Sequence, residues 1–353
     1  MGSAAGAIEE TMTLFDGGDQ PYAAPTRRRR RLSRVIPTVI ALLLVAAGAW
    51  GVVSFQRLVD QYTVWTFTPS AAAESIADGS RMTANGRFLF FASKPAVEPA
   101  ALFDSSCASE QEGSGILGCY LPTGRTIHLF DVTDERLAGL EDVVGAHEML
   151  HAAWDRMNTL ERQQLIPELE AAASRLSGNA DFTSRMAYYA KAEPGEHDNE
   201  LHSIIGTEVA SIGPALEAHY AQYLSDRGAV VALHEKSDAV FTDLQARSAA
   251  LSTAMAALKA GIDTEYAAYS SGYEGLNADV LAFNARTDWT SNAEISRATR
   301  ALESRRAALD AQYADVVAKH NEFNADHAAL TALTDQTNEL YKGLNLQPAL
   351  PSK

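Results

Sequence analysis

The sequence is poor in cysteine and, beyond its first tenth, poor in positive charge. It has 29 Lys and Arg against 45 Asp and Glu, which gives a formal net charge of −16. Six arginines gather near the start, at Arg27, Arg28, Arg29, Arg30, Arg31 and Arg34. The remainder is therefore more acidic than the total suggests. Because nucleic-acid binding needs Lys and Arg on the docking surface, we expect no nucleic acid among the partners.

Only two cysteines are present, Cys107 and Cys119, and their spacing fits no zinc ribbon. Such a close pair can form a disulfide, remain as two buried thiols, or supply half of a metal site. Disulfides persist in oxidising compartments. If this region lies outside the cytoplasm, we expect a Cys107–Cys119 disulfide that fixes a loop to the neighbouring strand.

Charged residues are absent from the stretch 35–55, which reads VIPTVIALLLVAAGAWGVVSF. About 21 apolar residues can cross a hydrocarbon core of roughly 30 Å as a helix. The arginines directly before it predict a cytoplasmic N-terminus by the positive-inside rule. A cleaved signal peptide is the alternative, but this run is long for one. The sequence predicts a single-pass transmembrane helix at 35–56, a cytoplasmic tail at 1–34, and an extracytoplasmic remainder.

Beyond a juxtamembrane segment at 57–86, local patterns predict few strands and many helices. Strands are expected at 88–91, 116–121 and 126–132, and a turn with Pro and Gly joins the last two into a hairpin. Helices are expected at 70–77, 135–157, 160–176, 183–191, 199–212 and 214–226. This order predicts an α+β domain over 87–228, with a small sheet and mostly helices.

From 229 onward the sequence is rich in Ala and has few helix breakers. Apolar residues recur at every seventh position from Ile262 to Phe283 and again from Ile295 to Leu330. The residues between these two runs, 286–292, are typical of a turn. We expect a long helical hairpin or coiled coil at 229–342, with a disordered tail at 343–353. An ordinary helical bundle remains the alternative, since several complementary positions are polar.

One short motif carries most of the chemistry, His147-Glu148-Met149-Leu150-His151. Two histidines four residues apart on a helix share one face, so both imidazoles can bind one ion. Zinc lowers the pKa of a bound water toward ~7, and the intervening glutamate can accept its proton as general base. The uncharged flanks at 143–146 and 152–154 indicate a largely buried helix.

This motif and its flanks resemble the zincin metallopeptidases, in which an HExxH helix supplies two zinc ligands and the general base. In metzincins the motif continues as HExxHxxGxxH, but Trp154 and Met157 occupy the Gly and last His positions here. That subclass is excluded. The resemblance implies a zincin-like catalytic domain and a Zn²⁺ cofactor.

In gluzincins a glutamate on a later helix completes the site, often within Asn-Glu-x-x-Ala/Ser. Here Asn199-Glu200-Leu201-His202-Ser203 resembles that second motif, so the resemblance implies Glu200 as the third ligand. The acidic residue often found four positions further on is replaced by Ile204.

Two other residues can compete with Glu200. Glu208 falls near the centre of a buried helical face, where an unpaired carboxylate is costly, so it is either the ligand or a hydrogen-bond acceptor for a ligating histidine. His202 is a weaker third choice. An oxyanion donor is also needed, and the sequence does not rank the candidates, which are Tyr188, Tyr189, His219, Tyr220 and Tyr223.

The sequence therefore predicts a membrane-anchored, extracytoplasmic zinc metallopeptidase that acts on peptides or proteins, with Glu148 as general base. The alternative is a cell-envelope scaffold in which the C-terminal hairpin is the working part and the zinc site is structural or degenerate. Zinc-dependent hydrolysis of a non-peptide envelope amide is a third hypothesis. The hairpin can hold an envelope partner or form a homo-oligomer.

Overall fold

The computed structural model describes residues 28–107, 117–192 and 194–344. Most of the predicted cytoplasmic tail and nearly all of the predicted C-terminal tail lie outside these ranges. The chain separates into two compact units, Met1–Val59 and Asp60–Lys353, and each is described by itself.

The predicted membrane anchor is wrong. Within the described ranges, no helix combines the length and the apolar character needed to cross a membrane. The apolar run is instead the middle of α1 (Arg28–Thr66), which begins inside the arginine run and continues past Phe55 through Arg57 and Asp60. The prediction of a single-pass membrane protein with an extracytoplasmic catalytic domain is corrected with it.

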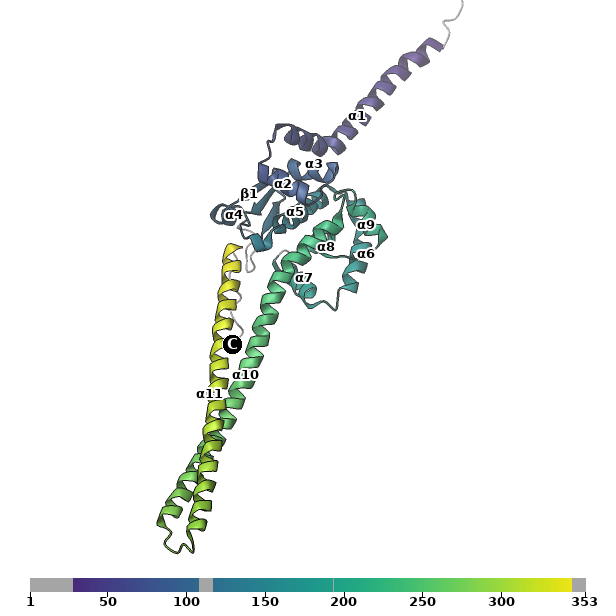
Figure 1. Cartoon of the computed structure of the whole chain (residues 1–353). Helices are drawn as coiled ribbons and strands as arrows, with labels where there is room; N and C mark the ends of the chain where they lie inside the picture. Colours follow the sequence, from purple (N-terminus) through teal and green to yellow (C-terminus); the bar gives the residue numbers. More distant parts are fainter. Residues whose placement is uncertain (1–27, 108–116, 193, 345–353) are drawn as a thin grey trace, which may run out of the picture. The chain divides into compact units, whose positions relative to one another are not determined.

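Helices make up most of the second unit (Figure 1). After α1 they are α2 (Ala71–Gly79), α3 (Ala84–Ala92), α4 (Ala100–Ser106), the 3-10 turn η1 (Glu135–Leu137), α5 (Leu140–Arg156), α6 (Thr159–Arg175), α7 (Ala180–Ala192), α8 (His197–Glu208), α9 (Pro214–Tyr220), α10 (Arg227–Ala285) and α11 (Asn292–Gly343).

The described sheet has three short strands, β1 (Ala96–Glu98), β2 (Gly118–Leu121) and β3 (Thr126–Phe130), in the order β1-β3-β2. β1 runs parallel and β2 antiparallel to β3. So small a sheet forms no full layer, although its strands contact α5, α4 and α2. The predicted α+β, zincin-like fold behind a transmembrane helix is therefore wrong, and the chain is mostly helical.

The strand predicted at 88–91 lies in a helix, α3. Thr83 caps this helix by accepting a hydrogen bond from the backbone N–H of Gly86. Leu89, Phe90 and Phe91 are consecutive and all buried, so neither a strand nor a helical period is visible in so short a run. The hairpin predicted from the Pro-Gly turn is confirmed, with Cys119 opposite His128.

Helix α5 is the centre of the main core and packs against α2, α3, α8 and the sheet. Its contact with α8 is close because Gly206 has no side chain. A Cβ at this position would lie 2.4 Å from Leu150 and 2.7 Å from the ring of Tyr220. This close approach, in the last turn of α8, lets the helix lie against α5.

The predicted disulfide is confirmed. Cys107 and Cys119 are bonded, with their Cα atoms 6.1 Å apart. Both are buried in a small cluster with Phe103 and Phe130. The bridge ties the end of α4 to β2, the strand that lies beside α5.

The predicted hairpin of two long helices is present as α10 and α11, which lie side by side (Figure 1). Ser291 caps the start of α11 by accepting from the backbone N–H of Glu294. Near its end, α11 packs Leu333, Leu340 and Leu344 against Leu137 and Leu244. The start of α10 and the end of α11 therefore both pack against the rest of this unit.

Candidate metal centre

The two histidines of the motif lie one turn apart on α5. The ring centroids of His147 and His151 are 4.8 Å apart, and the rings meet edge to face. His151 is 7% exposed, and Glu148 between them is 5% exposed. The expectation of a largely buried helix is confirmed.

Glu200 meets both histidines from the first turn of α8. Its Oε1 lies 3.4 Å from Nε2 of His151, and its Oε2 lies 3.8 Å from Nε2 of His147. Each of the three residues offers one atom that can bind a metal, and these three atoms all lie within 4.8 Å of one another. The structure thus brings together the three residues that the sequence predicted as ligands, in a group that can hold a metal ion.

Asn199 sets the tautomer of His151. Its side-chain Oδ1 lies 2.9 Å from Nδ1 of His151, while its Nδ2 donates to Glu196 over 3.0 Å. The second bond fixes which end of the amide is oxygen. An amide oxygen only accepts, so Nδ1 of His151 carries the proton. In the neutral imidazole, Nε2 then presents a lone pair toward Glu200.

His147 is held in its neutral form. Burial lowers its pKa well below the ordinary value, and the positive charges that His151, Arg185 and His234 would carry lower it further. The rings of His147 and His151 face a carboxylate that is only 3% exposed. Two nitrogens and one oxygen are a donor set that Zn²⁺ accepts, so these residues fit a bound cation.

Glu148 lies against the backbone of β2 and outside this ligand group. A Cβ at Gly118 would lie 2.7 Å from Oε1 of Glu148 and 2.6 Å from Val144. The glycine therefore leaves the space that the carboxylate occupies. This was not visible from the sequence, which gives no reason to connect position 118 with position 148.

A cleft of about 500 Å³ opens beside the centre. His147 and Glu148 form part of its wall, together with Leu117, Gly118, Leu140, Val143, Val144, Arg185, Tyr188, Tyr189, Glu208 and His234. Burial raises the pKa of Tyr189 well above its usual value, and the charges of Glu200 and Glu148 raise it further. Its hydroxyl therefore stays protonated and can donate.

The position of each candidate relative to the cleft shows which residues can act as oxyanion donors. Of the five candidates, Tyr188 and Tyr189 line it. Tyr220 is fully buried and donates to the carbonyl of His202. His219 pairs with His202, and its ring meets that of Tyr223 edge to face. These three residues therefore belong to the helical core.

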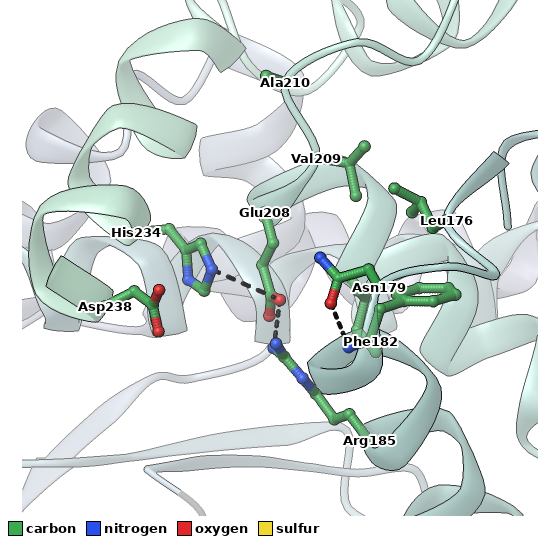
Figure 2. A pocket seen from close by; sticks show the side chains of 10 residues that line it. Leu176, Asn179, Phe182, Arg185, Glu208, Val209, Ala210, His234 and Asp238 are labelled. Carbon is green, nitrogen blue, oxygen red and sulfur yellow. Dashed lines mark hydrogen bonds and ion pairs between the residues drawn. The ribbon is translucent and has the colours of Figure 1, made fainter. Parts of the chain in front are cut away.

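Glu208, the alternative third ligand, lies at the other end of α8 from Glu200. It forms its ion pairs with residues outside the group of His147, His151 and Glu200. Its Oε2 forms an ion pair with Arg185 of α7 and lies 3.8 Å from Nε2 of His234 on α10 (Figure 2). This bridge stands between the cleft and a second hollow of about 210 Å³, lined by residues that include Phe182 and Asp238. No sequence pattern predicted that Arg185 and His234 are the partners of Glu208.

His202, the weakest candidate, is fully buried on the other side of α8. Its Nε2 lies 2.9 Å from Nε2 of His219, and its ring packs 5.3 Å from that of Trp154. Burial lowers its pKa well below the ordinary value, and His219 lowers it further. We interpret His202 as a core residue.

A second group of ligand-type side chains, Glu170, His197 and Asp198, joins α6 to the start of α8. Glu170 and His197 are about half exposed and are already paired with each other over 3.0 Å. Solvated charge pairs of this kind are common at protein surfaces.

No protein-family model, curated protein or solved structure matches this chain. The interpretation of the site therefore depends on its own residues and their geometry.

Proposed function

We propose that this protein is a zinc-dependent peptidase that hydrolyses peptide bonds in the cleft beside His147, His151 and Glu200. The observation that carries the proposal is the convergence of the imidazoles of His147 and His151 with the buried carboxylate of Glu200, with the carboxylate of Glu148 beside them. The resemblance of the HExxH and Asn-Glu segments to zinc peptidases supports the same assignment.

Zinc fits this donor set better than calcium or magnesium. Imidazole nitrogen suits zinc and its neighbours in the transition series, whereas calcium and magnesium prefer oxygen ligands. Bound zinc would supply Lewis acidity, which polarises a carbonyl and lowers the pKa of a water toward ~7.

The protein's own residues then handle the proton. Glu148 is one position from His147, outside the ligand group, and at the wall of the cleft. Its carboxylate accepts the proton of the attacking water, holds it away from bulk solvent, and delivers it to the leaving amine. Gly118 leaves the space that this carboxylate occupies.

Tyr189 is the donor that we assign to the developing oxyanion. Its hydroxyl is protonated at neutral pH, as that of an ordinary tyrosine is, and burial together with the nearby carboxylates raises its pKa further. A donor that is already oriented in a water-poor site stabilises negative charge without reorganisation. Leu140, Val143 and Val144 give the same cleft an apolar wall, which suits an apolar side chain beside the scissile bond.

The alternative, a scaffold with a structural zinc, is less well supported. Structural zinc normally has four protein ligands, whereas catalytic zinc keeps one position open. Among the residues that the structure describes, the group at His147 has three members, and a cleft opens next to it.

The test is metal analysis of the purified full-length chain together with a peptidase assay on a library of peptides. We expect about one zinc per chain and cleavage that Glu148→Gln abolishes while zinc remains bound. Glu168→Gln removes an exposed carboxylate of α6 and serves as the matched control, with cleavage unchanged. A protein that binds no zinc, or a Glu148→Gln variant that cleaves as fast as the wild type, would contradict the proposal.

A further inference from the structure

Helix α7 carries three of the side chains that line the cleft, those of Arg185, Tyr188 and Tyr189. Connections that contain Gly178 and Gly195 join it to α6 and α8. At Gly195 the backbone φ is +104°, a conformation that glycine adopts most readily. A Cβ at either glycine would meet no atom of the described chain within 4 Å. The orientation of α7 is therefore set by contacts of its own side chains.

The inner side of α7 has an apolar part and a charged part. Phe182, Met186 and Tyr189 pack against the main core. Arg185 lies among them in the sequence and forms an ion pair with Glu208 of α8. The four α7 residues fall at positions i, i+3, i+4 and i+7, so they share one side of the helix. Any rotation of α7 about its axis therefore moves Arg185 and Tyr189 together.

The apolar contacts and the ion pair constrain this rotation differently. Apolar packing is non-directional, so it holds the helix down without fixing a single orientation. A hydrogen bond between a guanidinium and a carboxylate is charge-assisted and depends on the angle at which the groups meet. Here Nη1 of Arg185 donates to Oε2 of Glu208, whose side chain is only 13% exposed. This pair is the contact that sets the rotation of α7.

Glu208 also reaches a third helix (Figure 2). Its Oε2 lies 3.8 Å from Nε2 of His234 on α10. Glu208 comes eight residues after Glu200, which is about 12 Å along the helix at 1.5 Å per residue. The carboxylate is thus separated from the metal centre, and it links α7, α8 and α10 at the edge of the cleft.

Tyr189 lies between this link and the metal centre. Burial has the largest influence on its pKa, and the charges of Glu200 and Glu148 raise the pKa further. The charge of Glu208 also raises it, and that of Arg185 lowers it. Because Coulombic interactions weaken with distance, the hydroxyl is close to both groups of charges. Tyr189 is one helical turn beyond Arg185, so a contact that fixes the arginine also fixes the tyrosine.

We propose that Glu208 is a positioning residue, which holds α7 through Arg185 in the orientation that directs Tyr189 to the metal centre. The role of Tyr189 rests on the proposed peptidase function, whereas the attachment of α7 does not. Glu208 binds no metal and transfers no proton. It acts on the reaction through the place that it gives to the hydroxyl of Tyr189.

Kinetics of variants of the full chain test this role. Glu208→Gln keeps the shape of the side chain but removes its charge, so Arg185 loses its ionic partner. We expect kcat to fall by about 10- to 100-fold, as for a displaced active-site group, with a smaller change in KM and zinc content unchanged. Arg185→Lys keeps the positive charge and should lose less activity than Arg185→Met. Glu74→Gln breaks an ion pair with Arg87 between α2 and α3, and as the matched control it should leave kcat unchanged.

Double variants show whether Glu208 acts through α7. In an Arg185→Met or a Tyr189→Phe background, Glu208→Gln should lower kcat by less than about twofold, since the contact or the hydroxyl that it controls is already absent. A loss of kcat as large in the Tyr189→Phe background as in the wild type overturns the proposal. In that case Glu208 would act on the substrate or on the fold directly.

Hydrogen exchange measures the attachment of α7 without any substrate. In Glu208→Gln the amides of α7 should exchange at least about tenfold faster, since a hydrogen bond between charged groups protects them by a factor of that order. Exchange in α5 and helical content by circular dichroism should stay unchanged. Equal exchange of α7 in the variant and the wild type overturns the proposal, whether or not the protein cleaves peptides. A wild type that cleaves no peptide contradicts the peptidase function, and faster exchange in Glu208→Gln would still support the attachment.

Discussion

Asn199 accepts a hydrogen bond from Nδ1 of His151 over 2.9 Å and thereby leaves Nε2 of the histidine free to bind a metal. The amide cannot be turned around, since its Nδ2 is engaged with Glu196. One residue therefore links the two halves of the centre, because Asn199 directly precedes the ligand Glu200. Partners of this kind fix both the tautomer and the ring orientation of a metal-binding histidine.

The first prediction concerns this hydrogen bond. Asn199→Leu keeps the approximate shape of the side chain but removes the acceptor, so Nδ1 of His151 loses its partner. We expect zinc affinity to fall by about 10- to 100-fold, measured by competition with a chromophoric chelator. Asn199→Asp retains an acceptor and should bind zinc as tightly as the wild type or more tightly. Equal affinity in the Leu variant and the wild type would show that the hydrogen bond does not orient the ligand.

The residues of this centre could be predicted because metal ligation depends on local helical spacing. His147 and His151 share a helical face by arithmetic alone, and Glu200 was suggested by its own short motif. What brings α8 to α5 is different in kind. The close packing of α8 on α5 depends on the absence of a side chain at Gly206. No local sequence pattern predicts that two helices approach each other at that glycine.

The errors have equally physical causes. The apolar run at 35–55 satisfies a count of apolar residues, but the helix that contains it extends well past the predicted limit at 56. The strand expected at 88–91 failed because four apolar residues fit a buried helix as well as a strand. Glu208 looked unpaired on its helical wheel, since its partners Arg185 and His234 come from two other helices.

The second prediction uses the space at Gly118. In Gly118→Ala the new Cβ competes with the carboxylate of Glu148, which must move away from the water that it should deprotonate. We expect kcat for peptide cleavage to fall by about 10²- to 10⁴-fold, the range for loss of a general base, with zinc content unchanged. Gly124→Ala is the control, since the nearest atom to a Cβ there is 3.5 Å away. Normal cleavage by Gly118→Ala would mean that Glu148 does not act from its position against β2.

The third prediction distinguishes the two tyrosines of the cleft. Tyr189→Phe removes a protonated hydroxyl near Glu148 and Glu200, so the oxyanion loses a donor. We expect kcat to fall by about 10²- to 10³-fold, with little change in KM. Tyr188→Phe removes the neighbouring hydroxyl and should change kcat much less. If Tyr188→Phe has the larger effect on kcat, the roles of the two residues are reversed.

The fourth prediction concerns stability and pH. Burial raises the pKa of Asp142, in the first turn of α5, to about 6, and the charge of Glu141 raises it further although Arg81 opposes both. In the unfolded chain this carboxyl ionises near its ordinary pKa of 3.8. As pH rises from about 4 to about 6, protons leave the unfolded state first, so the folded state loses stability across this window.

Asp142→Asn does not titrate and escapes this loss. We expect the difference in Tm, variant minus wild type, to increase between about pH 4 and pH 6 and to level off above it. Asp134 is the matched control of opposite sign, because its hydrogen bond with Arg136 lowers its pKa. For Asp134→Asn the same difference should therefore decrease as pH rises through the ordinary range for Asp. Thermal unfolding followed by circular dichroism, on protein stripped of metal by a chelator, measures both. A difference for Asp142→Asn that does not change with pH would show that Asp142 ionises normally in the folded protein.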